Sequence, residues 1–183
     1  DLDFVKSEKV AIIGYGIQGR AQALNLRDSG INVVIGNRED SYSSQAKDDG
    51  FEVHNIEEAC ALSTAIFLLV PDQAHSSVFN HLILPNIEKG NLLIVAHGYS
   101  LRFGKINVPP DIDVCMLAPR MPGFPIRENF VVGEGVPAFV DVVNDSTGSA
   151  KQRILGFAKA LGFTRAAVIH VPYTQETELD LFI

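Results

Sequence analysis

The sequence contains no tryptophan and only two cysteines and two methionines among its 183 residues. Cys60 and Cys115 lie far apart, form no C-x-x-C pair and have no histidine-rich segment nearby, so neither a disulfide framework nor a zinc site is indicated. We interpret both as small core residues. Such sparse cysteine is typical of a reducing compartment, which favours a cytoplasmic location.

Long apolar runs and an excess of positive charge are also missing. No apolar run approaches the length that spans a membrane, and the first residues carry no signal-peptide pattern, so we expect no membrane partner. The net charge of -7 argues against nucleic acid as a partner. It also means that a polyanionic cofactor has to be held by local backbone amides and a few well-placed cations.

The composition is that of an ordinary globular domain, with 46% hydrophobic and 20% charged residues. A chain of this length buries roughly 70% of its unfolded surface and needs no disulfide. Strand-like apolar runs alternate with helix-like segments, and no repeat interrupts them. This pattern predicts an α/β fold, a Rossmann-type doubly wound, mostly parallel sheet with helices on both faces. Asp1 is not a translation start, so we expect the natural polypeptide to begin upstream.

The most informative stretch, residues 9–38, predicts one βαβ unit. An apolar run at 10–13 leads into a G-x-G-x-x-G turn, then a helix-like segment at 21–29 and a second apolar run at 31–35. The first glycine of such a turn permits the tight bend, the second lets the backbone approach a pyrophosphate, and the third lets the helix pack on the sheet. The N–H groups of the helix start then face the phosphates. The turn therefore predicts a dinucleotide site, with a ligand-free glycine turn as the alternative.

The residues after the second strand bear on the choice between NAD and NADP. Arg38, Ser41 and Ser43 supply a cation and hydroxyl groups suited to a 2′-phosphate, so we predict NADP(H). Glu39 and Asp40 argue the other way, because a carboxylate beside the 2′-phosphate repels it. The same residues also suit a solvated turn that starts a helix at Ser41 or Ser43.

Further along the chain, helices and strands continue to alternate. We expect helices at 45–49, 56–62, about 72–82 and 149–161, the last ended by Gly162. We expect strands at 51–53, 65–70, 91–96, 113–117 and 166–171, with a loop at 100–110. Two further segments, 130–132 and 138–143, have the pattern of a strand pair joined by a glycine-rich turn.

Polar residues follow several of these strands, and ligands of such sheets bind beyond the carboxyl ends of the strands. We therefore expect Pro71-Asp72, His97 and Arg120 to share one cleft wall with the glycine turn. His97 is suited to acid–base or orienting work near a nicotinamide, and a histidine bonded only to local backbone is the alternative. Arg120 is suited to clamping an anionic substrate, unless it is a surface arginine. Asp180 suits a hard cation such as Mg²⁺, although helix-start acidity explains the carboxylates at 174–182 as well.

Several longer motifs are uncommon enough to point to one family. They are Gly14-Tyr15-Gly16 with Gln18-Gly19, AQALNLRDSG at 21–30, Val70-Pro71-Asp72, Ala96-His97-Gly98, Ala118-Pro119-Arg120 with Pro122-Gly123, and Glu176-Thr177-Glu178 with Asp180-Leu181-Phe182. Along nearly the whole chain the sequence resembles the N-terminal domain of ketol-acid reductoisomerase (acetohydroxyacid isomeroreductase). The resemblance implies an NADP-binding Rossmann domain at 1–173 and the start of a helical C-terminal domain at 174–183.

Members of that family convert 2-acetolactate or its ethyl homologue into a dihydroxy acid of branched-chain amino-acid biosynthesis. An alkyl group migrates under two Mg²⁺ ions, and NADPH reduces the resulting ketone. The resemblance implies an oxidoreductase of 2-keto or 2-hydroxy acids whose first domain is inactive alone and whose C-terminal domain forms any homo-oligomer. It implies His97 and Arg120 as catalytic residues and Asp180 as a metal ligand. The implied cofactor-binding residues are Gly14, Tyr15, Gly16, Ile17, Gln18, Gly19, Arg38, Ser41, Ser43, Val70, Pro71, Asp72 and Gly123.

Five positions depart from the family pattern. Arg120 stands where the family has lysine, Ile17 where it usually has serine, and Ile183 where it has glycine, while Met121 and Phe124 replace smaller or polar residues. Arginine stays charged but is bulkier and does not titrate. Two alternatives therefore remain open: a non-catalytic NAD(P)-binding paralogue, and a related reductase of another 2-keto or 2-hydroxy acid whose carboxylate Arg120 grips.

Overall fold

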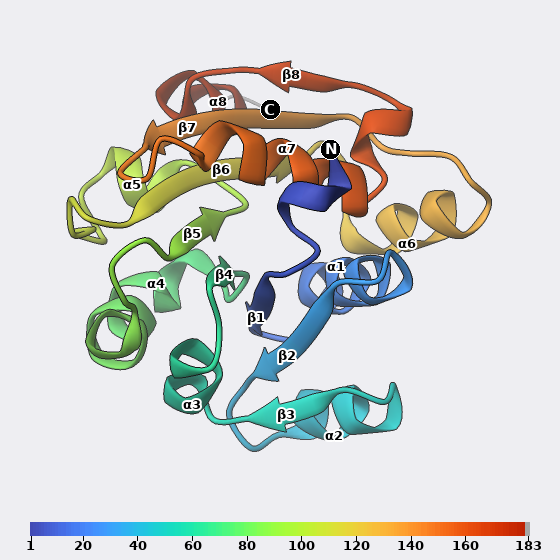
Figure 1. Cartoon of the computed structure of the whole chain (residues 1–183), viewed down its shortest axis with the longest axis horizontal. Coiled ribbons are helices and arrows are strands. Elements are labelled where there is room, and N and C mark those ends of the chain that lie inside the picture. The colour runs from blue at the N-terminus through green and yellow to red at the C-terminus, as the bar shows by residue number, and fades with distance from the viewer. Residues whose placement is uncertain (182–183) are drawn as a thin grey trace.

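Eight strands form a single sheet in the computed structural model, which describes residues 1–181 (Figure 1). The strand order is β3-β2-β1-β4-β5-β6-β7-β8, from the bottom to the top of Figure 1. Neighbouring strands are parallel except β6 and β7, which are antiparallel. The predicted doubly wound α/β fold is confirmed. The expectations for Phe182 and Ile183 lie outside the described residues.

Most elements lie within a few residues of their predicted positions. The strands are β1 (Lys9–Ile13), β2 (Asn32–Gly36), β3 (Glu52–His54), β4 (Ala65–Leu68), β5 (Leu92–Val95), β6 (Asp113–Pro119), β7 (Ala138–Asn144) and β8 (Val168–His170). The α-helices are α1 (Ile17–Asp28), α2 (Ser41–Asp48), α3 (Ile56–Ala61), α4 (Asp72–Val78), α5 (Tyr99–Arg102), α6 (Gly123–Val131), α7 (Ala150–Ala160) and α8 (Tyr173–Leu181). The helix expected to reach about residue 82 ends as α4 and continues as a π-helical turn, η2 (Phe79–Ile83). Over residues 1–181, no helix is long and apolar enough to cross a membrane.

The sheet separates two hydrophobic cores. Along β1, Val10 and Ile12 join the core that includes α1 and α7, whereas Ala11 and Ile13 join the core that includes α3 and η2. Because successive strand residues point to opposite faces, a strand that is covered on both sides has to be apolar throughout. Both cysteines are buried, as expected, and burial raises the pKa of the Cys60 thiol to about 12.

One predicted element is wrong. Residues 130–132 do not form a strand, because α6 runs to Val131 and packs along α1. Ile126 is buried in this contact, and the Asn25 amide donates a hydrogen bond to its carbonyl oxygen. Aromatic and β-branched residues favour strands, but the burial of Ile126 one turn earlier sets the helix here, and Val131 and Val132 lie exposed at its end. The second segment of the predicted strand pair, 138–143, does form a strand, β7, but this strand pairs with β6. The short helix α5 likewise occupies the start of a segment expected to be a loop.

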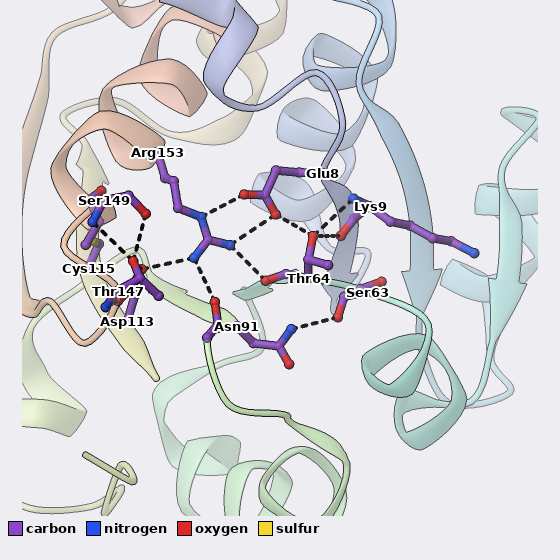
Figure 2. Close-up of polar contacts among 12 residues, drawn as sticks. Glu8, Lys9, Ser63, Thr64, Asn91, Asp113, Cys115, Thr147, Ser149 and Arg153 are labelled. Atoms are coloured by element: carbon purple, nitrogen blue, oxygen red, sulfur yellow. Dashed lines mark hydrogen bonds and ion pairs between the residues drawn. The ribbon is translucent and has the colours of Figure 1, made fainter. Parts of the chain in front are cut away.

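A buried ion cluster around Arg153 of α7 lies at the amino-terminal ends of the central strands (Figure 2). Its Nε and Nη2 donate to the Glu8 carboxylate at 2.7 and 3.0 Å, and its Nη1 donates to Asp113 at 3.0 Å. The carbonyl oxygens of Thr64 and Gly90 accept further hydrogen bonds. All five N–H groups of the guanidinium thus have acceptors. This cluster ties α7 to the segments that begin β1, β4, β5 and β6.

Candidate dinucleotide and acid–base site

The glycine turn that follows β1 has the geometry that its sequence predicts. Gly14 has a φ of +95°, a conformation that residues with a side chain rarely adopt. A Cβ on Gly19 would collide with the carbonyl oxygen of Gly14, so α1 packs closely against the turn. A Cβ on Gly16, in contrast, meets no described atom within 4 Å. Gly16 is therefore the position at which a ligand has open access to the backbone.

The start of α1 fits the pyrophosphate of a dinucleotide. Its N-cap is Gly16, which has no side chain to accept from the first N–H groups, and the first turn of α1 contains no acidic residue. These N–H groups and the positive end of the helix dipole are therefore available to an anion. An oxygen-rich diphosphate supplies the acceptors that this helix start otherwise lacks.

Neighbours of the turn come from two other segments, the one that enters α6 and the one that follows β4. Gly123 of α6 lies against Ile17, whose carbonyl oxygen a Cβ at Gly123 would strike, and Gln18 Nε2 donates to the Met121 carbonyl at 3.2 Å. Val70 follows β4 and packs on Gly14, with its Cγ1 2.9 Å from the place of a Cβ on that glycine.

Two residues of the turn, Tyr15 and Ile17, differ sharply in the exposure of their side chains. The Tyr15 side chain is buried, and its hydroxyl donates to Asp49 at 2.9 Å, so only its backbone faces the turn. Ile17 is 71% exposed beside it. Pro71, at the N-cap of α4, is exposed, and Asp72 is half-buried.

The end of β2 holds the residues predicted to bind a 2′-phosphate, but Asp40 organises them. Its carboxylate caps α2 by accepting from the N–H groups of Tyr42 and Ser43, and it also accepts from Arg38 Nε at 2.9 Å. The hydrogen bond from Arg38 lowers the pKa of Asp40. Ser43 is buried, and its hydroxyl donates to the Asp40 carbonyl, whereas Ser41 is exposed. A 2′-phosphate at this place gains the Arg38 cation and the Ser41 hydroxyl but meets the Asp40 charge.

At the carboxyl ends of β5 and β6, the structure brings His97 and Arg120 together with Asp180 of α8. Arg120 Nη2 donates to Asp180 Oδ1 at 2.6 Å, and His97 Nδ1 lies 3.5 Å from Asp180 Oδ2. Arg120 also lies over the ring of Phe139, with its guanidinium carbon 4.7 Å from the ring centre. The two predicted catalytic residues and the predicted metal ligand thus share one cluster.

Glu176 stands at the centre of this cluster, and the sequence did not single it out as a site residue. It is fully buried, and its Oε2 accepts from the Gly98 N–H at 2.8 Å and lies 2.9 Å from His97 Nδ1. Arg120 Nη1 donates to Oε1 at 3.4 Å. The hydrogen bond to Glu176 raises the pKa of the His97 imidazole, although partial burial opposes the rise. The four-residue spacing of Glu176 and Asp180, which places both on one helix face, is the signal that identifies it.

The cluster also fits a hard cation in its donor types. Ligand atoms of His97, Glu176 and Asp180 all lie within 4.8 Å of one another. Carboxylate oxygens are the protein ligands that Mg²⁺ prefers, and Mg²⁺ takes six ligands, of which several are usually water or substrate oxygens. Arg120 holds one oxygen of Asp180, so a cation bound there competes with the guanidinium.

The open glycine turn, the uncapped helix start and the polar residues at the carboxyl edge of a doubly wound sheet define a dinucleotide-binding domain of the Rossmann class. Comparison with known proteins gives the family. Residues 4–167 match "Acetohydroxy acid isomeroreductase, NADPH-binding domain", and the chain belongs to this family.

Individual relatives agree with this assignment. The chain is 46% identical over 181 residues to "Ketol-acid reductoisomerase (NADP(+))" of Pyrobaculum calidifontis, covering 98% of this chain and 55% of that protein. The structure of an NADH-preferring ketol-acid reductoisomerase from an uncultured archean superposes with a TM-score of 0.98 at 37% identity, covering 100% of this chain and 57% of the other. The chain therefore spans about half the length of these relatives.

A more distant structure shares the fold alone. It is a semialdehyde dehydrogenase NAD-binding protein from Cupriavidus necator, with a TM-score of 0.79 at 19% identity, covering 95% of this chain and 66% of the other.

Proposed function

We propose that this chain is the cofactor-binding domain of an NADP-dependent ketol-acid reductoisomerase that acts on 2-acetolactate or its ethyl homologue in branched-chain amino-acid biosynthesis. The observation that carries the proposal is the continuity between the glycine turn and the acid–base cluster. Arg120 belongs to the cluster, and the residues that follow it, Met121 and Gly123, contact Gln18 and Ile17 of the turn. A substrate held by the cluster therefore lies along the path of a cofactor bound at the turn.

The cofactor roles follow from the local geometry. The backbone from Gly14 to Gly19 receives the pyrophosphate, with Gly123 supporting the start of α1. Arg38 and Ser41 receive the 2′-phosphate of NADP(H), against the opposing charge of Asp40. The segment from Val70 to Asp72 lines the site from the end of β4.

His97 acts as the acid–base group. A carboxylate only accepts, so His97 Nδ1 carries the proton that bonds Glu176, and Nε2 is the nitrogen left for the substrate. Holding one imidazole nitrogen in this way fixes the tautomer and the ring orientation, as in other sites where a carboxylate orients a histidine. The raised pKa of His97 favours a protonated ring that stabilises developing negative charge on a substrate oxygen.

Asp180 and Glu176 are the residues that hold Mg²⁺, together with ligands outside the described residues. When bound, Mg²⁺ polarises substrate oxygens and stabilises negative charge on them. Arg120 has a second role available, because a guanidinium binds the carboxylate of a 2-keto acid in a bidentate fashion. This geometry also supports the second candidate, a reductase of another 2-keto acid. Assembly through a further domain and a cytoplasmic location remain predictions.

The test uses the longest natural polypeptide that contains this chain. NADPH consumption is followed with 2-acetolactate and Mg²⁺, with a metal-free control and a panel of simple 2-keto acids. Metal-dependent oxidation with 2-acetolactate supports the proposal, and His97→Gln abolishes it while the matched surface variant His81→Gln does not. Turnover of another 2-keto acid alone favours the second candidate. Saturable NADPH binding without any turnover points to a non-catalytic paralogue.

A further inference from the structure

His75 of α4 is a buried histidine beside the site described above, with its Nε2 3.6 Å from Asp72 Oδ1. Its side chain is 3% exposed, its Nε2 lies 2.9 Å from the Val70 carbonyl oxygen, and its Nδ1 lies 2.8 Å from Ser100 Oγ. A carbonyl oxygen only accepts, so Nε2 carries the proton and Nδ1 accepts from the Ser100 hydroxyl. Burial lowers the pKa of His75, which agrees with a neutral ring in this arrangement.

The two partners of His75 belong to different loops of the site. Val70 lies at the end of β4 and packs against Gly14 of the glycine turn. Ser100 is buried in α5, close behind His97 in sequence. A continuous line of contacts therefore runs from the glycine turn through Val70, His75 and Ser100 to the loop of the acid–base histidine.

We propose that His75 is a positioning residue that holds the Val70 loop and the His97 loop at a fixed separation. The inference rests on the proposed function, since hydride transfer requires the nicotinamide and the substrate to be aligned closely. An imidazole suits this task because its two nitrogens belong to one rigid ring. The site is buried, so water does not readily replace a lost partner, and an unpaired polar group there is costly.

Three substitutions separate the two contacts of His75. His75→Gln keeps a donor near the Val70 carbonyl but loses the acceptor for Ser100, whereas His75→Asn keeps the acceptor and loses the donor. Ser100→Ala removes only the second contact. In the full-length polypeptide, we expect His75→Asn to weaken NADPH binding roughly tenfold, the effect of one lost buried hydrogen bond. We expect His75→Gln and Ser100→Ala to lower kcat by a similar factor, with NADPH affinity within about twofold of wild type.

The double variant His75→Gln/Ser100→Ala gives a sharper test, because it removes the same contact twice. We expect its kcat to match that of either single variant, as for two residues that act through one interaction. Three outcomes would overturn the positioning role. The first is a kcat of the double variant that falls by the product of the two single effects. The others are equal losses of NADPH affinity in His75→Asn and His75→Gln, and losses of activity that simply follow the free energy of unfolding.

Hydrogen exchange in the ligand-free protein provides a test of the role of His75 that does not depend on cofactor binding. We expect Ser100→Ala to speed exchange of the Leu69 and Ala74 amides, which donate to the Ile13 and Pro71 carbonyl oxygens, by roughly tenfold, although the substitution lies on the other loop. Unchanged exchange there contradicts the link. Failure of the wild-type protein to bind NADPH or to turn over 2-acetolactate counts against the proposed function instead, and the exchange experiment still decides the role of His75.

Discussion

Arg120 Nη2 lies 2.6 Å from Asp180 Oδ1, so the cation at the end of β6 directly neutralises the carboxylate that we propose as a metal ligand. A divalent cation bound at this oxygen of Asp180 competes with the guanidinium. We expect Arg120→Met to raise the affinity of the full-length protein for Mn²⁺ about fivefold, because a partly exposed ion pair is worth up to about 1 kcal/mol. This affinity is measured by titrating the protein with Mn²⁺ and detecting the free Mn²⁺ by electron paramagnetic resonance.

Arg120→Lys is the matched control, since it keeps the competing charge. Its affinity for Mn²⁺ should stay within about threefold of wild type. Weaker Mn²⁺ binding in Arg120→Met than in Arg120→Lys would show that the arginine supports the cation instead of competing with it.

Asp40 gives a second prediction, on the choice of dinucleotide. Its carboxylate tethers Arg38 and stands where a 2′-phosphate would bind. Replacing it with serine keeps an N-cap for α2 but removes the charge. We expect Asp40→Ser to shift the ratio of NADPH to NADH affinity toward NADPH by about tenfold, the size of one close charge–charge interaction near a protein surface. Quenching or enhancement of nicotinamide fluorescence measures both affinities, and an unchanged ratio would remove Asp40 from cofactor selection.

Two glycines of the turn should respond differently to alanine. At Gly16 a Cβ meets no described atom within 4 Å, so Gly16→Ala should change the free energy of unfolding by less than about 1 kcal/mol while weakening dinucleotide binding at least about tenfold. At Gly19 a Cβ strikes the Gly14 carbonyl, so Gly19→Ala should destabilise the fold by about 1–3 kcal/mol. Urea unfolding and NADPH titration together distinguish the two effects. Equal destabilisation by both substitutions would contradict the assignment of Gly16 to ligand approach.

The cluster in Figure 2 predicts a large loss of stability when its cation is removed. Arg153→Met leaves the Asp113 carboxylate buried without its counter-ion, and breaking a buried pair from one side costs about 3–5 kcal/mol. Chemical denaturation measures the change. Lys6→Met is the control, because its ion pair with Asp3 is exposed and its loss should leave stability nearly unchanged. Similar effects of both substitutions would mean that the cluster is not a structural clamp.

Asp113 also predicts part of the acid sensitivity of the fold. Burial disfavours its charged form, but hydrogen bonds from Thr147 and Arg153 outweigh burial and hold its pKa below the usual value. Its contribution to stability is therefore complete above about pH 4 and is lost as the pH falls through the lower folded-state pKa. Asp113→Asn should be less stable at neutral pH, with a smaller loss on acidification. An unchanged slope between pH 5 and 3 in that variant would contradict this origin.

Much of the site is predictable from the sequence because its signals are local. The glycine turn is set by consecutive residues with steric requirements of their own, and His97 and Arg120 each follow an apolar strand directly. Parallel strands bring their carboxyl ends to one edge, so residues at those ends converge without further information. The chain order of strands and helices follows from the same alternation of apolar runs.

Local signals fail where a distant contact decides the outcome. Residues 130–132 have a strand-like composition, yet they lie at the end of α6, a helix that is anchored on α1 by the burial of Ile126. Glu176 looks like an ordinary acidic residue at a helix start, and only the docking of α8 against Gly98 places it under His97. Ser43 is a local case, because its hydroxyl donates to the carbonyl oxygen of Asp40, three residues earlier, in the cap of α2.

The sequence by itself determined the fold class and the dinucleotide turn, since short-range sterics and hydrophobic periodicity control these features, and it offered His97 and Arg120 as candidate catalytic side chains. Tertiary structure decided which carboxylates face His97 and that Arg120 neutralises Asp180. Those pairings join residues brought together by packing of whole elements, and their strength depends on burial and on competing partners, neither of which is written in the order of residues.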